Sequence, residues 1–193
     1  PNFLLYMNEG LSKFEKNDQI MSICGYGLKI KKPVNYEADV YLYGRSSSWG
    51  WGTWKYRWES VDWQLKDWYE FKNDKKAVRK FNRAGSDMFK MLKSVAEQGA
   101  SSWAIRFCYA QFKQDRYSIM PFESLVQNIG FGSEGTNTRF VYSRFKIALS
   151  KGEKTSFNWG KTLRVNEEIL KSCYQYHSLS IRIYSRIRYT LGV

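Results

Sequence analysis

One short stretch of this chain, Ser48–Trp58, concentrates tryptophan and constrains both fold and function. It holds four of the eight tryptophans, with Gly50 and Gly52 separating the first three. Indole rings offer large apolar faces and one N–H donor, so they suit contacts that are partly dry and partly hydrogen-bonded. The glycines permit close approaches of the backbone. The stretch therefore predicts either a contact surface or, because aromatic clusters are often buried, a tryptophan-rich core strand.

The composition predicts a folded, strongly basic protein. Of the 193 residues, 43% are hydrophobic and 18% aromatic, which excludes a disordered chain. The formal net charge is +13, a surplus that favours nucleic acid, an anionic membrane face or phosphate-bearing ligands as partners. An ordinary solvated basic surface would give the same charge, so charge alone identifies no partner.

Cysteine usage indicates a reducing, intracellular location. Cys24, Cys108 and Cys173 are odd in number and far apart, so they predict neither a disulfide framework nor a zinc site. No apolar run reaches the roughly 18 residues that a membrane span needs, and no signal peptide opens the chain. The first residue is Pro1, from which we expect an N-terminal portion to be missing.

Hydrophobic spacing predicts alternating helices and strands, and hence an α/β fold. Helices are expected over 2–15, in parts of 58–80, from Ser86 to Gly99, from about 102, after Asn166 and over 179–191; strands are expected over 19–27, 38–42 and 117–120. Ser86 and Asn166 are the expected N-caps of their helices, and Asp87 is expected in a first turn.

Two polar features within this pattern suggest binding. The helix from 102 is apolar at nearly every position except Arg106 and Gln111, so we expect Arg106 to be buried beside an anionic partner or several acceptors. The loop 124–137 is rich in glycine, amides and hydroxyls. Loops of this kind bind phosphates or sugar hydroxyls through backbone N–H groups, although generic surface turns have the same composition.

The usual catalytic motifs are absent from the sequence. It contains no P-loop, no Gly-x-Gly-x-x-Gly, no Gly-x-Ser-x-Gly and no His-Glu-x-x-His. His177 is the only histidine, so a histidine metal site is excluded, and we expect it at the surface or with satisfied hydrogen bonds. Carboxylates near the tryptophan stretch remain: one of them could act as a general base, or all could be solvent-exposed charges.

The order of motifs resembles the C-terminal half of a bacterial family of nucleotide-sugar glycosyltransferases with the GT-A fold, related to the family 2 enzymes. Five blocks, spread over about 130 residues in the same order, carry the resemblance: Pro-Asn-Phe-Leu-Leu-Tyr-Met-Asn-Glu-Gly-Leu at 1–11, Ser-Ile-Cys-Gly-Tyr at 22–26, Trp-Gly-Trp-Gly-Thr-Trp-Lys at 49–55, Ser-Trp-Ala-Ile-Arg-Phe at 102–107 and Ser-Leu-Val-Gln-Asn-Ile-Gly-Phe at 124–131.

The resemblance implies that a nucleotide-binding half precedes Pro1 and carries the Asp-x-Asp type motif. That motif would hold a divalent metal, Mg²⁺ or Mn²⁺, so its main ligands are not expected in this chain. Residues 1–140 would then be the acceptor-side part of the transferase domain, and 141–193 a basic, partly helical C-terminal extension. We expect this fragment alone to show little or no transfer activity.

The resemblance also suggests roles for individual residues. The expected acceptor-binding residues are Trp49, Trp51, Trp54 and Trp103, with Trp54 partly structural. No Glu-Asp pair follows the tryptophans, so the base is sought among other carboxylates. Asp87, which matches an acidic position before the next helix in the family, is the first choice, followed by Asp62 and Glu59. The expected donor or phosphate-binding residues are Arg106, Asn128, Gly130, Thr136 and Asn137. Where relatives often have Gly-Thr-His, this chain has asparagine at 137, which is a poor metal ligand.

The expected function is sugar transfer from a nucleotide-sugar donor to a glycan or lipid-linked acceptor in bacterial surface-polysaccharide synthesis, with an inverting outcome carried over from family 2. A non-catalytic carbohydrate-binding module and a single-stranded nucleic-acid binder are the alternatives. The expected location is cytoplasmic, with peripheral contact to the inner face of the membrane as an option. The segment 179–191 has the pattern of a basic amphipathic helix, which would lie on an anionic membrane or dock on its own domain.

Overall fold

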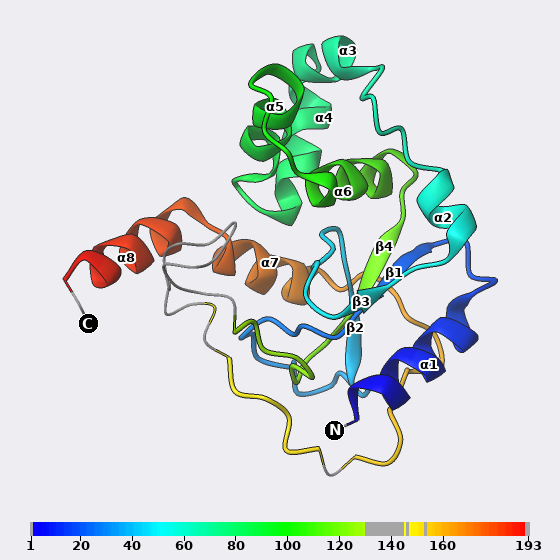
Figure 1. The fold of residues 1–193 in the computed structure, drawn as a ribbon. Coiled ribbons are helices and arrows are strands. Elements are labelled where there is room, and N and C mark those ends of the chain that lie inside the picture. The colour runs from blue at the N-terminus through cyan, green and yellow to red at the C-terminus, as the bar shows by residue number, and fades with distance from the viewer. Residues whose placement is uncertain (1, 130–144, 146, 153, 192–193) are drawn as a thin grey trace.

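The computed structural model describes residues 2–129, 145, 147–152 and 154–191 and shows a mixed α/β fold around a four-stranded sheet (Figure 1). The strands are β1 (Ile20–Cys24), β2 (Val40–Tyr43), β3 (Trp51–Gly52) and β4 (Tyr117–Pro121), in the order β2-β4-β1-β3. β1 and β4 run parallel, and β2 and β3 pair antiparallel with β4 and β1. The sheet is therefore mixed, with segments far apart in sequence as its central strands.

Helices cover both faces of this sheet. They are α1 (Phe3–Phe14), α2 (Lys55–Glu59), α3 (Trp68–Asn73), α4 (Lys75–Phe81), the short 3-10 helix η1 (Asn82–Ala84), α5 (Met88–Glu97), α6 (Trp103–Lys113), α7 (Glu167–Tyr176) and α8 (Leu179–Thr190). Figure 1 shows α3 to α6 gathered on one side of the sheet, with α1 on the other and α8 extending away from the body. The chain thus forms three layers, helix, sheet and helix.

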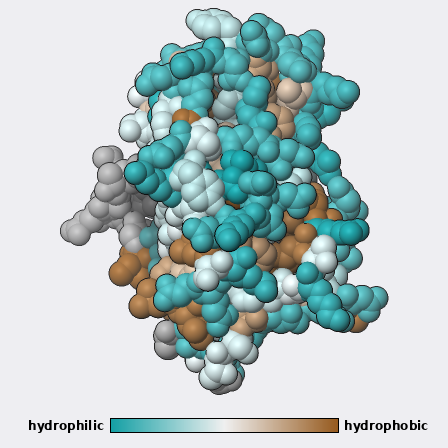
Figure 2. Space-filling view, turned by 90° about the vertical axis from the view of Figure 1, so that its right-hand side faces the viewer, coloured by the Kyte–Doolittle hydropathy of each residue, from teal (hydrophilic) through white to brown (hydrophobic). Residues whose placement is uncertain are grey.

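Alternation along β2 divides the core between the two faces, because successive side chains of a strand point to opposite sides. Val40 and Leu42 pack with Ile119 in a cluster on the α1 side. Tyr41 and Tyr43 pack in a second cluster, under α4 to α7. Figure 2, which looks onto the side that carries α1 and α2, shows mostly hydrophilic residues, with hydrophobic ones gathered in its lower half.

The structure confirms most of the predicted elements and corrects one helix start. The helix expected from Ser86 begins at Met88, with Asp87 as its N-cap and no capping bond from that side chain. The Ser86 hydroxyl instead donates to the carbonyl of His177 at 2.9 Å, so it is occupied by a tertiary contact. The other predicted cap is confirmed, because the Asn166 side chain accepts from the amide of Ile169 at 3.1 Å.

Segments after residue 145 pack on the same two cores. Trp159 is 7% exposed in the α1-side cluster, and its Nε1 donates to Glu9 at 3.1 Å. Ile169 and Cys173 of α7 are buried in the other cluster. The domain boundary expected at residue 140 lies outside the described residues and stays a prediction.

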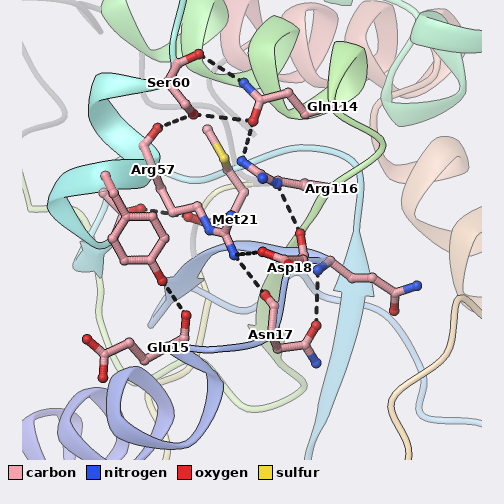
Figure 3. Close-up of polar contacts among 11 residues, drawn as sticks. Glu15, Asn17, Asp18, Met21, Arg57, Ser60, Gln114 and Arg116 are labelled. Atoms are coloured by element: carbon pink, nitrogen blue, oxygen red, sulfur yellow. Dashed lines mark hydrogen bonds and ion pairs between the residues drawn. The ribbon is translucent and has the colours of Figure 1, made fainter.

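A buried arginine joins α2 to the turn between α1 and β1 (Figure 3). Arg57 is 3% exposed, and its Nη2 donates to the Asn17 carbonyl and to Asp18 Oδ1, both at 3.1 Å. Beside it, Arg116 Nε donates to the Asp18 carbonyl at 3.0 Å. Two arginines therefore hold the same turn, from α2 and from the start of β4.

We expect Arg57→Ala to lower the free energy of unfolding by about 2–3 kcal/mol, because it removes two hydrogen bonds and leaves a hole in a packed site. Asp18→Ala should have a much smaller effect, because its carboxylate is 92% exposed and Arg57 keeps its bond to the Asn17 carbonyl. Urea unfolding of both variants measures the difference. Equal losses would show that the ion pair, and not burial, dominates.

Candidate functional site

A cavity of about 280 Å³ lies between the sheet, α5 and α6. Its walls include Tyr26 from the segment after β1, the stretch Arg45–Trp49 that follows β2, and His177 at the end of α7. The lining thus combines aromatic rings, three serines, a guanidinium and an imidazole. Concave sites with apolar walls and a few convergent polar groups are typical of small-molecule binding.

Trp49 forms the aromatic wall of this cavity. Its ring meets that of Tyr26 edge to face, with centroids 4.6 Å apart. The next residue, Gly50, has φ of 54°, and a Cβ there would lie 2.6 Å from Val126 Cγ1, so only glycine fits. This turn separates Trp49 from Trp51, which packs elsewhere, and thereby splits the tryptophan stretch into two contact surfaces.

A half-buried ion pair lies at the cavity wall. Arg45 Nη1 and Nη2 donate to Asp87 Oδ1 and Oδ2 at 2.8 and 3.3 Å, and the side chains are 18% and 13% exposed. Burial by itself would raise the pKa of Asp87, but the charge and hydrogen bonds of Arg45 outweigh it and lower the pKa to about 2. Asp87 therefore stays ionised and holds Arg45 in a fixed position at the cavity.

His177 is 6% exposed, and its ring lies nearly parallel to that of Tyr43, with centroids 6.3 Å apart. Burial raises the pKa of Tyr43 well above its usual value and that of the Cys108 thiol to about 11, so both stay protonated at neutral pH. Arg45 is permanently charged. His177 adds an imidazole, a side chain type that can serve as a general base, to the lining of the cavity.

Hydroxyl groups under the cavity form a buried polar network that reaches Ser46. The Ser22 hydroxyl lies 2.7 Å from that of Ser118 and 3.2 Å from that of Ser46. Ser118 donates to Gln111 Oε1 at 2.8 Å, and Gln111 Nε2 donates to the Tyr43 carbonyl at 3.0 Å. The network connects β1, β4 and α6 to the loop after β2 and so fixes the serine side of the cavity.

Two of the predicted acceptor-binding tryptophans meet in a second aromatic group. Trp51 stacks on Trp103, with centroids 4.9 Å apart and an interplanar angle of 23°. Trp58 packs against both, and Trp63 lies 4.3 Å from Trp58 between centroids. Trp58 and Trp103 are each 38% exposed. Part of the tryptophan stretch is thus core-like, and part of it reaches the surface.

Trp54 lies apart from both aromatic groups. Its Nε1 donates to the Leu11 carbonyl at 3.1 Å and so ties the start of α2 to α1.

The two other carboxylates predicted as catalytic bases lie at the surface. Glu59 forms an exposed pair with Lys55 at 3.7 Å, and Asp62 accepts from the amides of Gln64 and Lys66. Neither of these carboxylates lines the cavity.

The predicted donor-side residues are only partly described. Arg106 is half-buried on α6; its Nη1 donates to the Ser102 carbonyl at 3.5 Å, and its buried Nε has no hydrogen-bond partner in the described part of the chain. Asn128 is half-buried in the loop after β4. Gly130, Thr136 and Asn137 lie outside the described residues, so their role stays a prediction.

Across residues 2–129, 145, 147–152 and 154–191, no group of three or more His, Cys, Asp or Glu side chains is placed to hold a metal ion. Asp87, the buried candidate, has both carboxylate oxygens on Arg45. The described residues therefore do not fit the divalent metal that the resemblance implies, and its expected ligands upstream of Pro1 stay a prediction.

Sequence reasoning missed Tyr26, Arg45 and Ser46 as cavity residues and gave His177 little weight. One local signal pointed to Arg45 and Ser46: the polar run Arg-Ser-Ser-Ser begins one glycine after a buried strand. Nothing local joins it to His177, which is more than 100 residues further along the chain.

Comparison of the chain with protein-family models, with curated proteins and with solved structures returned no match.

Proposed function

We propose that this chain is the acceptor side of a sugar transferase with the GT-A fold, and that the cavity beside Trp49 takes the sugar that receives the transferred residue. The observation that carries the proposal is the pairing of an indole wall with serine hydroxyls and a fixed guanidinium around about 280 Å³. Pyranose rings have apolar C–H faces and hydroxyl edges, so they need both kinds of wall.

Arg45 has a defined place in this proposal. Because Asp87 occupies one side of the guanidinium, the remaining N–H donors are held in a fixed direction at the cavity wall. They are suited to bind sugar hydroxyls or the phosphate of a lipid-linked acceptor. The Ser22–Ser46 contact at 3.2 Å holds one serine hydroxyl of the cavity lining in place.

The proposed reaction is attack of an acceptor hydroxyl on the anomeric carbon of a nucleotide sugar. The new C–O bond forms as the bond to the nucleotide diphosphate breaks, the leaving group keeps that electron pair, and the hydroxyl proton passes to a base. His177 is our candidate for this base at the cavity; Asp87, Asp62 and Glu59 stay alternatives.

Direct sugar binding tests the cavity. With a mixture of glucose, galactose, mannose and N-acetylglucosamine, we expect saturation-transfer NMR signals from the unmodified protein and at least a tenfold weaker signal from Trp49→Ala, which removes the stacking wall. Trp54→Phe, which changes an indole outside the cavity, should bind as the unmodified protein does. Equal signals from all three proteins, or none from any, would contradict the proposed site.

A carbohydrate-binding module would give the same result with free sugars. The two functions differ in the donor, because a binding module has no reason to recognise a diphosphate. Transfer from a nucleotide sugar by the full-length protein, with Mg²⁺ or Mn²⁺ present, supports the transferase; sugar binding without transfer or hydrolysis of any donor supports the module. Salt-sensitive retention on single-stranded oligonucleotides would support the nucleic-acid alternative.

A further inference from the structure

The C-terminal helix α8 exposes a set of aliphatic side chains along one side. Leu179, Ile183, Ile187 and Leu191 are 60%, 50%, 51% and 71% exposed, and Tyr184 is 58% exposed. Residues four apart lie on one side of a helix, so the four aliphatic residues form a continuous strip. Figure 1 shows α8 extending from the body at the end of α7.

The side of α8 that faces the body is mixed, with Ile181 and Tyr189 about 40° to either side of the buried Ser185 and 38% and 42% exposed. Ser185 is 3% exposed and is the buried residue of this helix. At 3.6 residues per turn, Ser185 lies about opposite the aliphatic strip. Arg182, on the same side as Ser185, is half-buried, and its charge helps to lower the pKa of Asp87. This arrangement is the reverse of a helix docked on its own core, in which the apolar strip would face inward.

Arginines border the aliphatic strip on both sides. At 100° per residue, Arg186 lies beyond one edge of the strip and Arg188 beyond the other. The guanidinium of Arg188 lies 6.0 Å from the ring of Tyr184. The sequence of α8 contains no acidic residue. An exposed apolar strip between cationic side chains has the composition of a helix that lies in the interface of an anionic membrane.

We propose that α8 docks this protein on an anionic lipid surface, with the aliphatic strip in the headgroup region and the two arginines on lipid phosphates. The helix has 12 residues, about 18 Å, and no helix in the described ranges is long and apolar enough to cross a membrane. The helix therefore lies along the surface. This inference is independent of the proposed sugar transfer, because it uses no residue of the cavity.

Charge favours a lipid surface over a second copy of the chain. A dimer through the strip would bring two arginine-bordered helices together on chains that each carry +13, with no acidic side chain on α8 to pair with the arginines. Phosphate headgroups satisfy the arginines and the apolar interface takes the aliphatic strip. An anionic lipid surface therefore offers partners both to the arginines and to the aliphatic strip of α8.

Sedimentation with vesicles tests the proposal. We expect the unmodified protein to bind phosphatidylcholine vesicles that contain about a third phosphatidylglycerol, and to bind pure phosphatidylcholine weakly. Ile183→Ser with Ile187→Ser should lower partition into anionic vesicles at least about tenfold. Arg186→Gln should lower it about fivefold. Neither change touches a buried residue, so thermal melting should be unchanged.

Two matched controls address non-specific effects. Val34→Ser removes an apolar side chain that is 100% exposed elsewhere, and Lys55→Gln removes one charge from a side chain that is 85% exposed on α2. Both should bind vesicles as the unmodified protein does. Equal binding to neutral and anionic vesicles, or equal losses in controls and α8 variants, would overturn the proposal. So would a dimer in light scattering that Ile183→Ser with Ile187→Ser dissociates, because the strip would then serve self-association.

Discussion

Asp87→Asn is expected to lower the free energy of unfolding by about 3–5 kcal/mol, because it leaves the guanidinium of Arg45 charged, 18% exposed and without its partner. Replacing both members with apolar residues, Arg45→Met with Asp87→Leu, should cost less than Asp87→Asn alone, since no buried charge remains. Urea unfolding measures these differences. A non-additive double-variant cycle would identify the pair, and not either side chain alone, as the source of stability.

The exposed pair Lys80–Asp115 offers a matched control. Its charged atoms lie 4.0 Å apart, and its side chains are 64% and 78% exposed, so Asp115→Asn should change the free energy of unfolding by about 0.5 kcal/mol or less.

The pH dependence of the free energy of unfolding gives a second test of the Arg45–Asp87 pair. The folded pKa of Asp87 is lowered from 3.8 to about 2, so its contribution is present above pH 4 and is lost as the pH falls towards 2. Asp87→Asn should remove this part of the acid sensitivity; an unchanged acid profile would contradict it.

The fold class was accessible from sequence because the main elements depend on local patterns. Helical spacing of apolar residues predicted α1, and glycine after the last periodic residue predicted the end of α5, where Gly99 has φ of 69°. The parallel pairing of β1 with β4 was not accessible, since nearly 100 residues separate the strands. The predicted start of α5 was wrong because the Ser86 hydroxyl does not cap the helix. It donates instead to the carbonyl of His177, 91 positions further along the chain.

The candidate site was only partly accessible for the same reason. Composition singled out the tryptophan stretch, but the positive φ of Gly50 decides that Trp49 reaches the cavity while Trp51 packs on Trp103. Arg106 drew attention as a cation among apolar residues, yet among the described residues it is Arg45 that pairs with a largely buried carboxylate, Asp87. That pairing joins the loop after β2 to the start of α5, a contact that no periodicity encodes.

In the full-length protein, supplied with a nucleotide-sugar donor and Mg²⁺ or Mn²⁺, His177→Gln is expected to lower kcat for transfer by about a hundredfold or more, the usual contribution of a positioned base. Glutamine keeps a polar side chain of similar length but cannot take the proton of the acceptor hydroxyl. Sugar binding by saturation-transfer NMR should stay within about threefold, because Trp49 and Ser46 still line the cavity. A loss of binding equal to the loss of kcat would indicate a structural role instead.

Variants of the alternative carboxylates test whether one of them, and not His177, is the catalytic base. Asp62→Asn and Glu59→Gln should change kcat less than about twofold, since Asp62 accepts backbone amides of its own turn and Glu59 is paired on the surface. Asp87→Asn requires correction for its unfolded fraction, because instability alone would reduce activity. If kcat per folded molecule falls a hundredfold in Asp87→Asn while His177→Gln keeps its activity, Asp87 and not His177 is the catalytic base. A carboxylate with a pKa near 2 is a weak base, and both oxygens of Asp87 accept from Arg45, so Asp87 is poorly suited to take the proton of the acceptor.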